Sequence, residues 1–267
     1  MSDHVVTDSV TMLRRSVRRM RRYPSLTLFI AGIPVVLLLL FVFVFGGTLG
    51  SGLGGAAVVR GGRDTYVAYV VPGILLLTVM SAAQGTAISV AMDMTAGIVA
   101  RFRTMAIARA SVLAGHVLGS VIQTMLAVAV VVVVAVVIGF RPTTGLVSWA
   151  AAGGLLVLTA VAVGSLSVAL GLVTDSVETA SNLPMLLTLL LFLSSAFVPT
   201  ASMPEPLRWF AENQPVTPIV ETLRGLLLGA SIGNSGIVAV GWCAVISSAG
   251  FLWARHLYER VPARVAA

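Results

Sequence analysis

The chain has 267 residues, of which 58% are hydrophobic and only 10% are charged, and its mean hydropathy is +1.01. This apolar content exceeds the roughly 45–50% of a soluble domain, so the composition excludes a soluble globular protein and predicts an integral membrane protein. All 17 basic residues are arginine, and the net charge is +7. The arginines flank apolar segments and do not alternate with aromatic residues, which argues against nucleic-acid binding.

The first predicted element lies at the N-terminus, in Asp8–Arg22. Val10, Leu13, Val17 and Met20 recur there at helical spacing among arginines. This pattern favours an interfacial helix over residues 8–22 that rests on anionic headgroups. The alternative is a disordered basic segment that only sets the topology.

Six apolar segments are long enough to cross a membrane, which takes about 20 helical residues. They are residues 26–46, 66–92, 114–138, 147–173, 182–200 and 235–254. Leu26–Phe45 carries no charge and precedes no convincing cleavage site, so we expect a retained signal anchor. The alternation of a β-barrel is missing from the sequence, and helices satisfy the backbone in lipid. The sequence therefore predicts an all-α fold with six transmembrane helices in one domain, 1–267.

Arginine is concentrated on one side of these predicted spans. Six arginines precede the first span, three lie between the second and third, and three follow the sixth, whereas five lie on the opposite side. Because basic loops stay in the cytoplasm, we expect a multi-pass protein with both termini cytoplasmic.

The segment between the second and third spans contains Arg101, Arg103 and Arg109. Its apolar residues, Phe102 and Met105 among them, could form one face of a short helix that contacts a partner. A basic loop that only obeys the topology rule explains the same residues equally well.

Five prolines divide the stretch 199–233, which is too long for an unstructured loop. They predict two short helices interrupted around Gln214–Pro218. Glu221 and Arg224 are three residues apart and could pair on one helix face. The apolar end of this stretch favours a hairpin that dips partway into the outer leaflet; the alternative is a surface lid with only a packing role.

The sequence lacks motifs for catalysis and metal binding. Without lysine it cannot contain a G-x-x-x-x-G-K-[ST] phosphate loop, its three histidines are scattered, and its lone Cys243 excludes a disulfide framework. No acidic residue lies at the centre of a predicted span, which argues against ion-coupled transport. Pro34 and Pro184 could still break two spans as a secondary transporter requires, and a non-transporting scaffold is a further alternative.

Three stretches resemble the permease subunit of type-2 ABC exporters, the group that includes daunorubicin-resistance-type drug exporters. GIVARFRTMAIARASVLAG (Gly97–Gly115) is similar to the family's basic-aromatic segment, with Ala106 in place of the usual proline. The stretch Ser194–Gly229 is similar to the family's signature, including its Q-P-V-T-P core. YVVPGILLLTVM (Tyr69–Met80) also fits.

This resemblance implies six helices per subunit, a second permease subunit that is identical or paralogous, and two separate ATPase subunits. The chain itself would bind no cofactor, while the ATPases would bind ATP and Mg²⁺. The resemblance makes 8–22 the interfacial helix, 98–110 the coupling helix and 203–230 an extracellular re-entrant hairpin. It assigns to the ATPase contact Arg101, Phe102, Arg103, Thr104, Met105 and Arg109. It assigns to the hairpin gate Gln214, Pro215, Thr217, Pro218, Glu221 and Arg224.

The implied function is ATP-driven export of a hydrophobic or amphipathic compound (a drug, natural product or lipid) across the bacterial cytoplasmic membrane. Such a permease would serve multidrug export and antibiotic resistance. Polysaccharide or lipid-linked glycan export, the family's other common activity, would favour aromatic stacking along the route, and only 7% of the residues are aromatic.

Overall fold

The computed structural model describes residues 24–46, 63–95, 109–174 and 176–260, and every regular element within these ranges is a helix. The long helices are α2 (Pro24–Leu40), which continues into the π-helical turn η1 (Phe41–Phe45), α4 (Arg63–Thr95), α6 (Arg109–Val137), α7 (Leu146–Val173) and α12 (Ser235–Arg260). Between α7 and α12 lie the short helices α8 (Val177–Asn182), α9 (Met185–Phe192), η2 (Thr200–Ser202), α10 (Glu205–Asn213) and α11 (Val216–Leu228). The predicted interfacial helix 8–22 lies outside the described residues.

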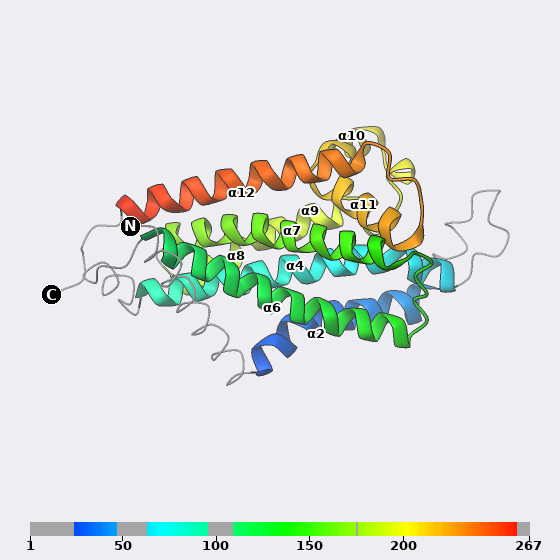
Figure 1. Ribbon diagram of the computed structural model, residues 1–267, viewed down its shortest axis with the longest axis horizontal. Coiled ribbons are helices and arrows are strands. Elements are labelled where there is room, and N and C mark those ends of the chain that lie inside the picture. Colours follow the sequence, from blue (N-terminus) through cyan, green and yellow to red (C-terminus); the bar gives the residue numbers. More distant parts are fainter. Residues whose placement is uncertain (1–23, 47–62, 96–108, 175, 261–267) are drawn as a thin grey trace.

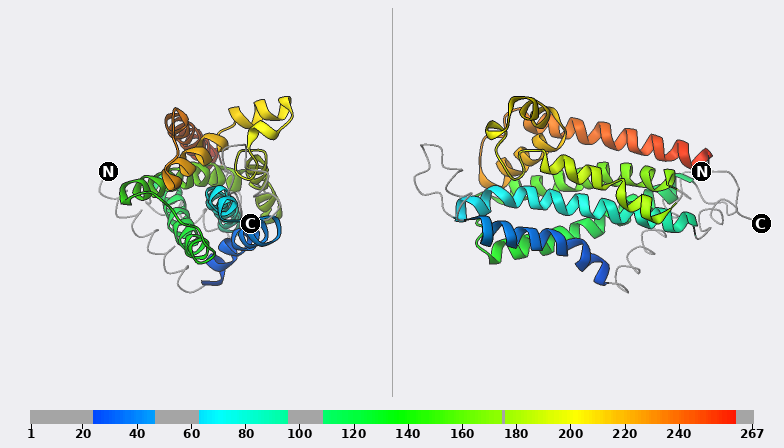
Figure 2. Two further views of the ribbon diagram at one scale, coloured as in Figure 1. Left: turned by 90° about the vertical axis from the view of Figure 1, so that its right-hand side faces the viewer. Right: turned by 180° about the vertical axis from the view of Figure 1, so that it is seen from behind.

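The long helices lie side by side along the long axis of the molecule (Figure 1). Viewed along this axis, α4 lies in the middle of the others (Figure 2). It is the most buried of the four long apolar helices, with 83% of an 18-residue apolar stretch inside the molecule against 22% for α12. We call the end where α4 stops and α6 starts the Asp93 end. The opposite end, where α10 and α11 gather, is the Arg224 end.

Four described helices are long and apolar enough to cross a membrane: Thr65–Thr95, Leu113–Val137, Leu146–Val173 and Ser235–Tyr258. They correspond to the predicted second, third, fourth and sixth spans. Two apolar stretches, Ile30–Phe45 and Val177–Phe192, form shorter helices. The first of these coincides with the predicted span 26–46.

The prediction of a single helix over 182–200 is wrong. Only α9 (Met185–Phe192) lies inside this range, and α8 ends at its first residue, Asn182. The two helices are separated because Pro184 has no N–H and its ring hinders a regular helix across it. After the break, the amides of Leu186 and Leu187 bond to carbonyls three residues back, those of Leu183 and Pro184. α9 then ends at Phe192, and a turn of residues 193–198 (the 193–198 turn), buried at residues 194–197, follows where a helix was expected.

The interior consists of two apolar clusters. The larger one includes Tyr66, Ile74, Leu191 and Leu223 and extends through the middle of the bundle to the Arg224 end. The smaller one, which we call the Val90 cluster, lies toward the Asp93 end. It consists of Val90, Leu113, Val117, Val168, Ala169, Leu172, Ala254 and Tyr258. α4, α6, α7 and α12 all contribute to it.

Several buried threonine hydroxyl groups are satisfied within their own helix. Thr78, Thr124 and Thr159 each donate to the carbonyl four residues earlier, at 2.8 Å in all three cases. This bond lets a small polar residue lie in an apolar bundle without an unpaired donor.

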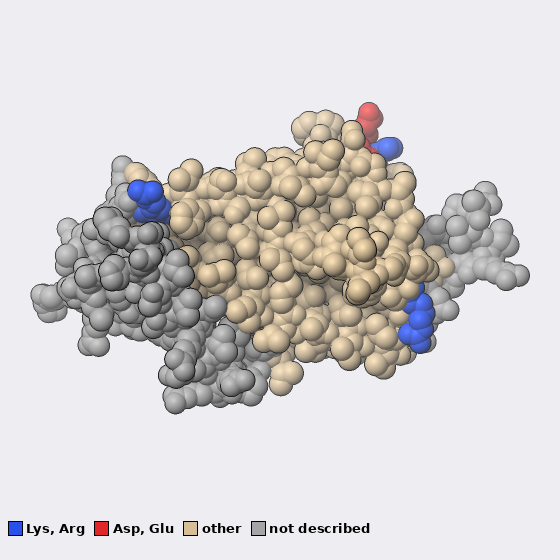
Figure 3. Space-filling view, in the orientation of Figure 1, with Lys and Arg blue, Asp and Glu red and all other residues tan. Residues whose placement is uncertain are grey.

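On the face shown in Figure 3, charged side chains of the described residues occur only near the two ends of the molecule. The surface between them carries none, and large apolar side chains such as Val133 and Val245 are exposed. A charge-free apolar band of this kind is what a hydrocarbon environment requires.

Candidate functional site

The 193–198 turn is the centre of a polar network at the Arg224 end. Ser194, Ser195 and Phe197 are buried, although the chain here is not helical. Ser194 Oγ donates to the Leu191 carbonyl at 2.5 Å and accepts from the Ala196 amide at 3.2 Å. A buried turn leaves more backbone groups than its own side chains can satisfy, so partners must come from elsewhere.

Two side chains at the junction of α10 and α11 supply such partners. Gln214 Nε2 donates to the carbonyls of Leu190 at 2.9 Å and Leu193 at 2.6 Å. Thr217 Oγ1 accepts from the Ser195 amide at 3.3 Å and donates to the Ala211 carbonyl at 2.5 Å. These bonds tie the end of α9 to the start of α11.

Arg224 ties the same turn to α4. Its Nη2 donates to the Ser195 carbonyl at 2.9 Å and to the Tyr69 carbonyl at 3.4 Å. Its guanidinium carbon lies 3.9 Å from the centre of the Tyr69 ring, a cation–π geometry. Tyr69 Oη donates to the same Ser195 carbonyl at 2.9 Å, so α4, the turn and α11 meet at one oxygen atom.

Aromatic and small residues form the remaining packing contacts of the 193–198 turn. The Phe197 ring stacks on Phe41 of η1 at a centroid distance of 5.0 Å and on Phe192 at 5.1 Å. A Cβ atom at Gly73 of α4 would lie 2.8 Å from the Ala196 carbonyl oxygen. Only glycine therefore lets the turn approach α4 this closely.

The prolines of the predicted hairpin occupy positions where no amide is needed. Pro215 is the residue before the first turn of α11, and Pro218 lies within that turn, where amides have no intrahelical partner. The predicted interruption at Gln214–Pro218 is thus shorter than expected, since the helix starts at Val216 and not at Ile219.

Glu221 and Arg224 do not form the pair that their spacing suggested. Glu221 Oε2 accepts from Ser235 Oγ at 3.2 Å, at the start of α12. Arg224 instead points to the Ser195 and Tyr69 carbonyls, and among the described residues the structure records no ion pair between the two. The helical spacing would allow this ion pair, but in the folded structure each of the two side chains bonds to residues outside α11.

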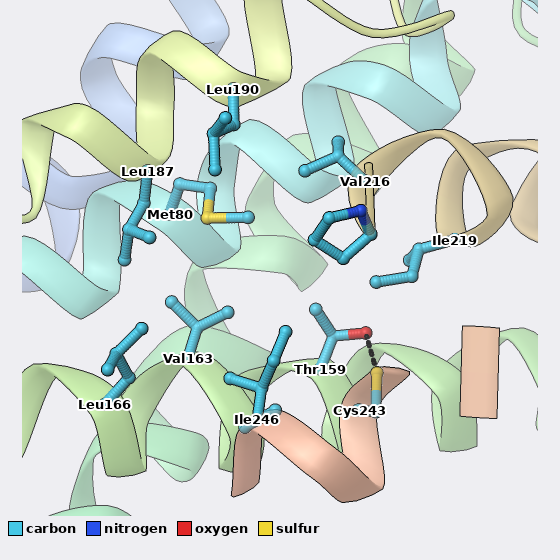
Figure 4. Close-up of a pocket in the computed structure, with 12 residues that line it drawn as sticks. Met80, Thr159, Val163, Leu166, Leu187, Leu190, Val216, Ile219, Cys243 and Ile246 are labelled. Atoms are coloured by element: carbon cyan, nitrogen blue, oxygen red, sulfur yellow. Dashed lines mark hydrogen bonds between the residues drawn. The ribbon is translucent and has the colours of Figure 1, made fainter. Parts of the chain in front are cut away.

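The inner end of α11 reaches the middle of the bundle. Pro215, Val216 and Ile219 line a cavity of about 40 Å³ together with residues from the interior of three long helices (Figure 4). These are Met80 of α4, Thr159 of α7 and Cys243 of α12, and the last two lie 3.6 Å apart through Oγ1 and Sγ. The other end of α11 contacts the loop between α6 and α7, because Thr143 Oγ1 donates to the Leu228 carbonyl at 3.0 Å.

Several buried polar atoms in this region have no hydrogen-bond partner. They are Ser195 Oγ, Gln214 Oε1 and Arg224 Nε, and the other such side-chain atoms in the described part of the chain are Tyr66 Oη and Ser167 Oγ. An unpaired buried polar group costs about 1–3 kcal/mol. Ser195 Oγ, Gln214 Oε1 and Arg224 Nε lie at the contact between the 193–198 turn and α10–α11, so most of this cost falls there.

The residues predicted to contact an ATPase lie almost entirely outside the described part of the chain. Arg101, Phe102, Arg103, Thr104 and Met105 fall in the range 96–108, and Arg109 is the first residue of α6. The described ends of α4 and α6 both lie at the Asp93 end (Figure 1). Within the described ranges no group of three or more His, Cys, Asp or Glu side chains could hold a metal ion.

Tyr69 and Ser195 are site residues that residue-level reasoning missed. Both lie inside the stretches on which the family resemblance rests, but no local pattern marks a tyrosine on one helix as the partner of an arginine 155 positions later.

Comparison with known proteins gives a consistent result. Residues 7–228 match the family model described as "ABC-2 type transporter". The chain is 26% identical over 247 residues to the daunorubicin resistance ABC transporter permease protein DrrB1 of Streptomyces coeruleorubidus. The aligned region covers 91% of this chain and 84% of that protein. It is also 26% identical over 212 residues to the probable doxorubicin resistance ABC transporter permease protein DrrC of Mycobacterium tuberculosis, which covers 79% of this chain and 75% of that protein.

Proposed function

The chain belongs to the ABC-2 type transporter family and is a membrane permease subunit of an ABC exporter, and we propose that it moves a hydrophobic or amphipathic compound outward on energy from a separate ATPase. The observation that carries this proposal is the match over 91% of the chain to a permease named for daunorubicin resistance. The two relatives are both named for resistance to drugs, which supports drug export over glycan export.

The proposed complex has two permease subunits and two ATPase subunits. ATP and Mg²⁺ bind to the ATPases, and the permease contributes no catalytic group. The Asp93 end faces the cytoplasm and the Arg224 end faces outward, which follows from the arginine distribution in the sequence. Both termini are then cytoplasmic.

In this proposal the ATPases act on the segment 98–110. Arg101, Phe102, Arg103, Thr104, Met105 and Arg109 form the contact surface. Its support in the structure is indirect: α4 ends at Thr95 and α6 begins at Arg109 at the same end of the bundle, so force applied between them enters two core helices directly.

Six transmembrane crossings, including a broken fifth one made of α8 and α9, complete the proposed topology, with 203–230 as a re-entrant hairpin. The length and position of α11 support the hairpin. α11 has 13 residues and is therefore about 20 Å long. It runs from the Thr143 loop at one end of the bundle to the mid-bundle cavity, which supports a hairpin that enters the membrane from that end.

We assign to this hairpin the role of an outer gate. Gln214, Thr217 and Arg224 hold the 193–198 turn against it. At the same contact Ser195 Oγ, Gln214 Oε1 and Arg224 Nε have no hydrogen-bond partner. Pro215 and Pro218 place the start of α11, and Glu221 links it to α12. Opening a contact in which some polar atoms are unpaired costs less free energy than opening one in which every polar atom is hydrogen-bonded.

The transport route lies between two permease subunits in this proposal. The cavity inside one subunit has a volume of about 40 Å³, whereas pockets for drug-sized ligands have volumes of roughly 300–1,000 Å³. A path along apolar outer faces would discriminate weakly among substrates, because a methylene is worth only about 1–3 kcal/mol in an apolar pocket.

The test uses inside-out membrane vesicles that contain the permease with its ATPase, and daunorubicin as the probe. ATP-dependent, vanadate-sensitive uptake is expected. Uptake should vanish when Arg101, Phe102 and Arg103 are replaced by alanine, while Arg264→Ala, which removes an arginine after the last helix, leaves it intact. Normal uptake and ATP hydrolysis in the triple variant would refute the assignment of the coupling segment.

A further inference from the structure

The short helix α10 lies across the direction of the long helices at the Arg224 end and extends to one side of the bundle (Figures 1 and 2). It has nine residues, Glu205–Asn213, and its main neighbours are α11 and η2. Ala211 is fully buried, and its carbonyl accepts from Thr217 Oγ1 of α11 at 2.5 Å. α10 is thus attached to the bundle through its C-terminal half.

One side of α10 carries its charges. Glu205, Arg208 and Glu212 follow one another at spacings of three and four residues, so they lie along one stripe of the helix. Arg208 Nε donates to Glu212 Oε1 at 2.8 Å, and Thr200 Oγ1 of η2 donates to the same oxygen at 3.3 Å. The charged stripe therefore borders η2 and contains an ion pair.

The opposite side of α10 is apolar and exposed. Pro206, Trp209 and Phe210 occur at positions i, i+3 and i+4, which places them on one face, and Leu207 lies beside them. Trp209 is 69% exposed, Phe210 39% and Leu207 37%. A patch of large exposed apolar side chains marks contact with a protein partner, a ligand or a membrane.

The position of α10 favours the membrane. On the face in Figure 3, the charged side chains of the described residues lie near the two ends and the surface between them is apolar. The Arg224 end is therefore a place where hydrocarbon gives way to headgroups. Apolar surface reaches this end, because Phe192 and Val198 are also exposed. A helix that lies in this boundary buries its apolar face in lipid while its charges remain at the headgroups.

The residue types of the exposed face agree with this position. Trp, Phe and Leu are the side chains that interfacial helices place in lipid, and Trp is enriched where hydrocarbon meets headgroups. α10 carries two carboxylates, Glu205 and Glu212, against one guanidinium, Arg208. Attraction to anionic lipid therefore does not hold it, and burial of the apolar face does.

We propose that α10 is an interfacial helix that binds the lipid bilayer at the boundary between headgroups and acyl chains. Leu207, Trp209 and Phe210 are buried in lipid, and the Arg208–Glu212 pair faces the headgroups. The hairpin then has one arm in the membrane interface, α10, and one arm inside the protein, α11. The inference goes beyond the proposed function, because it holds for any transported compound and does not require the hairpin to be a gate.

The test uses electron paramagnetic resonance on the permease, assembled with its ATPase in phosphatidylcholine vesicles. Each variant carries one spin label, at a cysteine in a Cys243→Ser background. Collisions with oxygen report exposure to lipid, and collisions with a nickel chelate report exposure to water. The labelled positions on the apolar side of α10 are Leu207→Cys, Trp209→Cys and Phe210→Cys. Glu205→Cys, on the charged side of the same helix, is the matched control, and Val245→Cys, an exposed position of α12, is the reference for acyl chains.

At the three apolar positions, oxygen collisions should exceed nickel collisions, at a depth of about 5–10 Å inside the headgroup boundary. The Glu205→Cys label should show the reverse, and the Val245→Cys label should lie deeper than all of them. Adding phosphatidylglycerol, an anionic lipid, should not change these depths, because the acidic residues of α10 outnumber its single arginine.

A second measurement keeps the native α10 side chains, in case a labelled variant fails to assemble. Replacing Trp149, Trp242 and Trp253 by Phe leaves Trp209 as the only tryptophan. Its emission should be quenched by lipid brominated near the headgroup and protected from aqueous iodide.

Three results would overturn the inference. Labels on the apolar side that collide mainly with the nickel chelate would make α10 a lid in water. Labels shielded from both reagents would mean that protein covers this face, for example a second copy of the chain. Lipid contact that appears only with phosphatidylglycerol would make the attraction electrostatic. ATP-dependent uptake of daunorubicin by the same vesicles is a separate readout, so its loss with the lipid contact intact would count against the proposed function alone.

Discussion

The guanidinium carbon of Arg224 lies 3.9 Å from the centre of the Tyr69 ring, and both side chains donate to the carbonyl oxygen of Ser195. One backbone oxygen thus joins α4, α11 and the turn after α9, which are far apart in the sequence. Because the surrounding bundle is apolar, Tyr69 Oη and Arg224 Nη2 both depend on this one carbonyl oxygen as a hydrogen-bond acceptor. The two side chains should therefore contribute to stability as a unit.

Arg224→Leu and Tyr69→Phe test this coupling. The Tyr69→Phe variant loses one neutral hydrogen bond, worth about 0.5–1.5 kcal/mol, and keeps its ring. The Arg224→Leu variant loses the charge-assisted hydrogen bonds to the Ser195 and Tyr69 carbonyls, each worth up to about 1.5–3 kcal/mol, and the cation–π contact. Denaturant unfolding in detergent should show that the double variant loses less stability than the two single variants combined. Strictly additive losses would show that the two donors act independently.

Gln214→Leu should weaken the attachment of α9 to the junction of α10 and α11. The change removes both donations to the carbonyls of Leu190 and Leu193 and leaves two part-buried acceptors without this donor, at a cost of up to about 1–3 kcal/mol each. Limited proteolysis near the 193–198 turn should become faster. Asn213→Leu is the matched control, since its amide is exposed and bonds only within α10; equal sensitivity of both variants would contradict this role of Gln214.

Gly171→Ala should destabilise the bundle, because its Cβ would meet the Ala87 carbonyl 2.7 Å away. Overpacking of this kind costs about 1–3 kcal/mol. Gly154→Ala, in the same helix but with no atom within 4 Å of the added carbon, should leave the midpoint unchanged or raise it, since alanine has the higher helix propensity. Thermal unfolding of both purified variants measures the difference, and an unchanged midpoint for Gly171→Ala would refute the close backbone contact between α7 and α4.

Val216→Ile should be tolerated, because Val216 lines the mid-bundle cavity and one more methylene can occupy that space. The expected stability is equal to the original or higher by up to about 0.8 kcal/mol. Val220→Ile makes the same change on the same helix at a fully buried position that does not line the cavity. It should cost about 1–3 kcal/mol. A larger loss in Val216→Ile than in Val220→Ile would mean that the cavity closes in solution.

Composition and hydropathy predict the class of this protein and the positions of its five long helices. Apolar segments of sufficient length form helices in lipid whatever they pack against, because each backbone group bonds within its own helix. The broken span at Pro184 was harder to anticipate. Proline occurs within α2 and α4 without ending either helix, so the residue type alone does not decide between a continuous helix and a break.

The Glu221–Arg224 pair shows the limit of local reasoning in another way. Their spacing places them on one helix face, yet Glu221 bonds to Ser235 and Arg224 to Ser195 and Tyr69. In a buried position a charged side chain is directed by whichever partners replace its hydration most completely. Those partners come from other helices, which spacing cannot identify.

By itself, then, the sequence determined the membrane class, the main helices and the family, since these depend on composition, local period and motif. Only the tertiary structure decided that Ser195 accepts from Tyr69 and Arg224, that α11 reaches the mid-bundle cavity, and that Asp93 faces His116. The physical reason is that each helix satisfies its backbone alone, whereas a buried polar side chain must find its partner across the bundle.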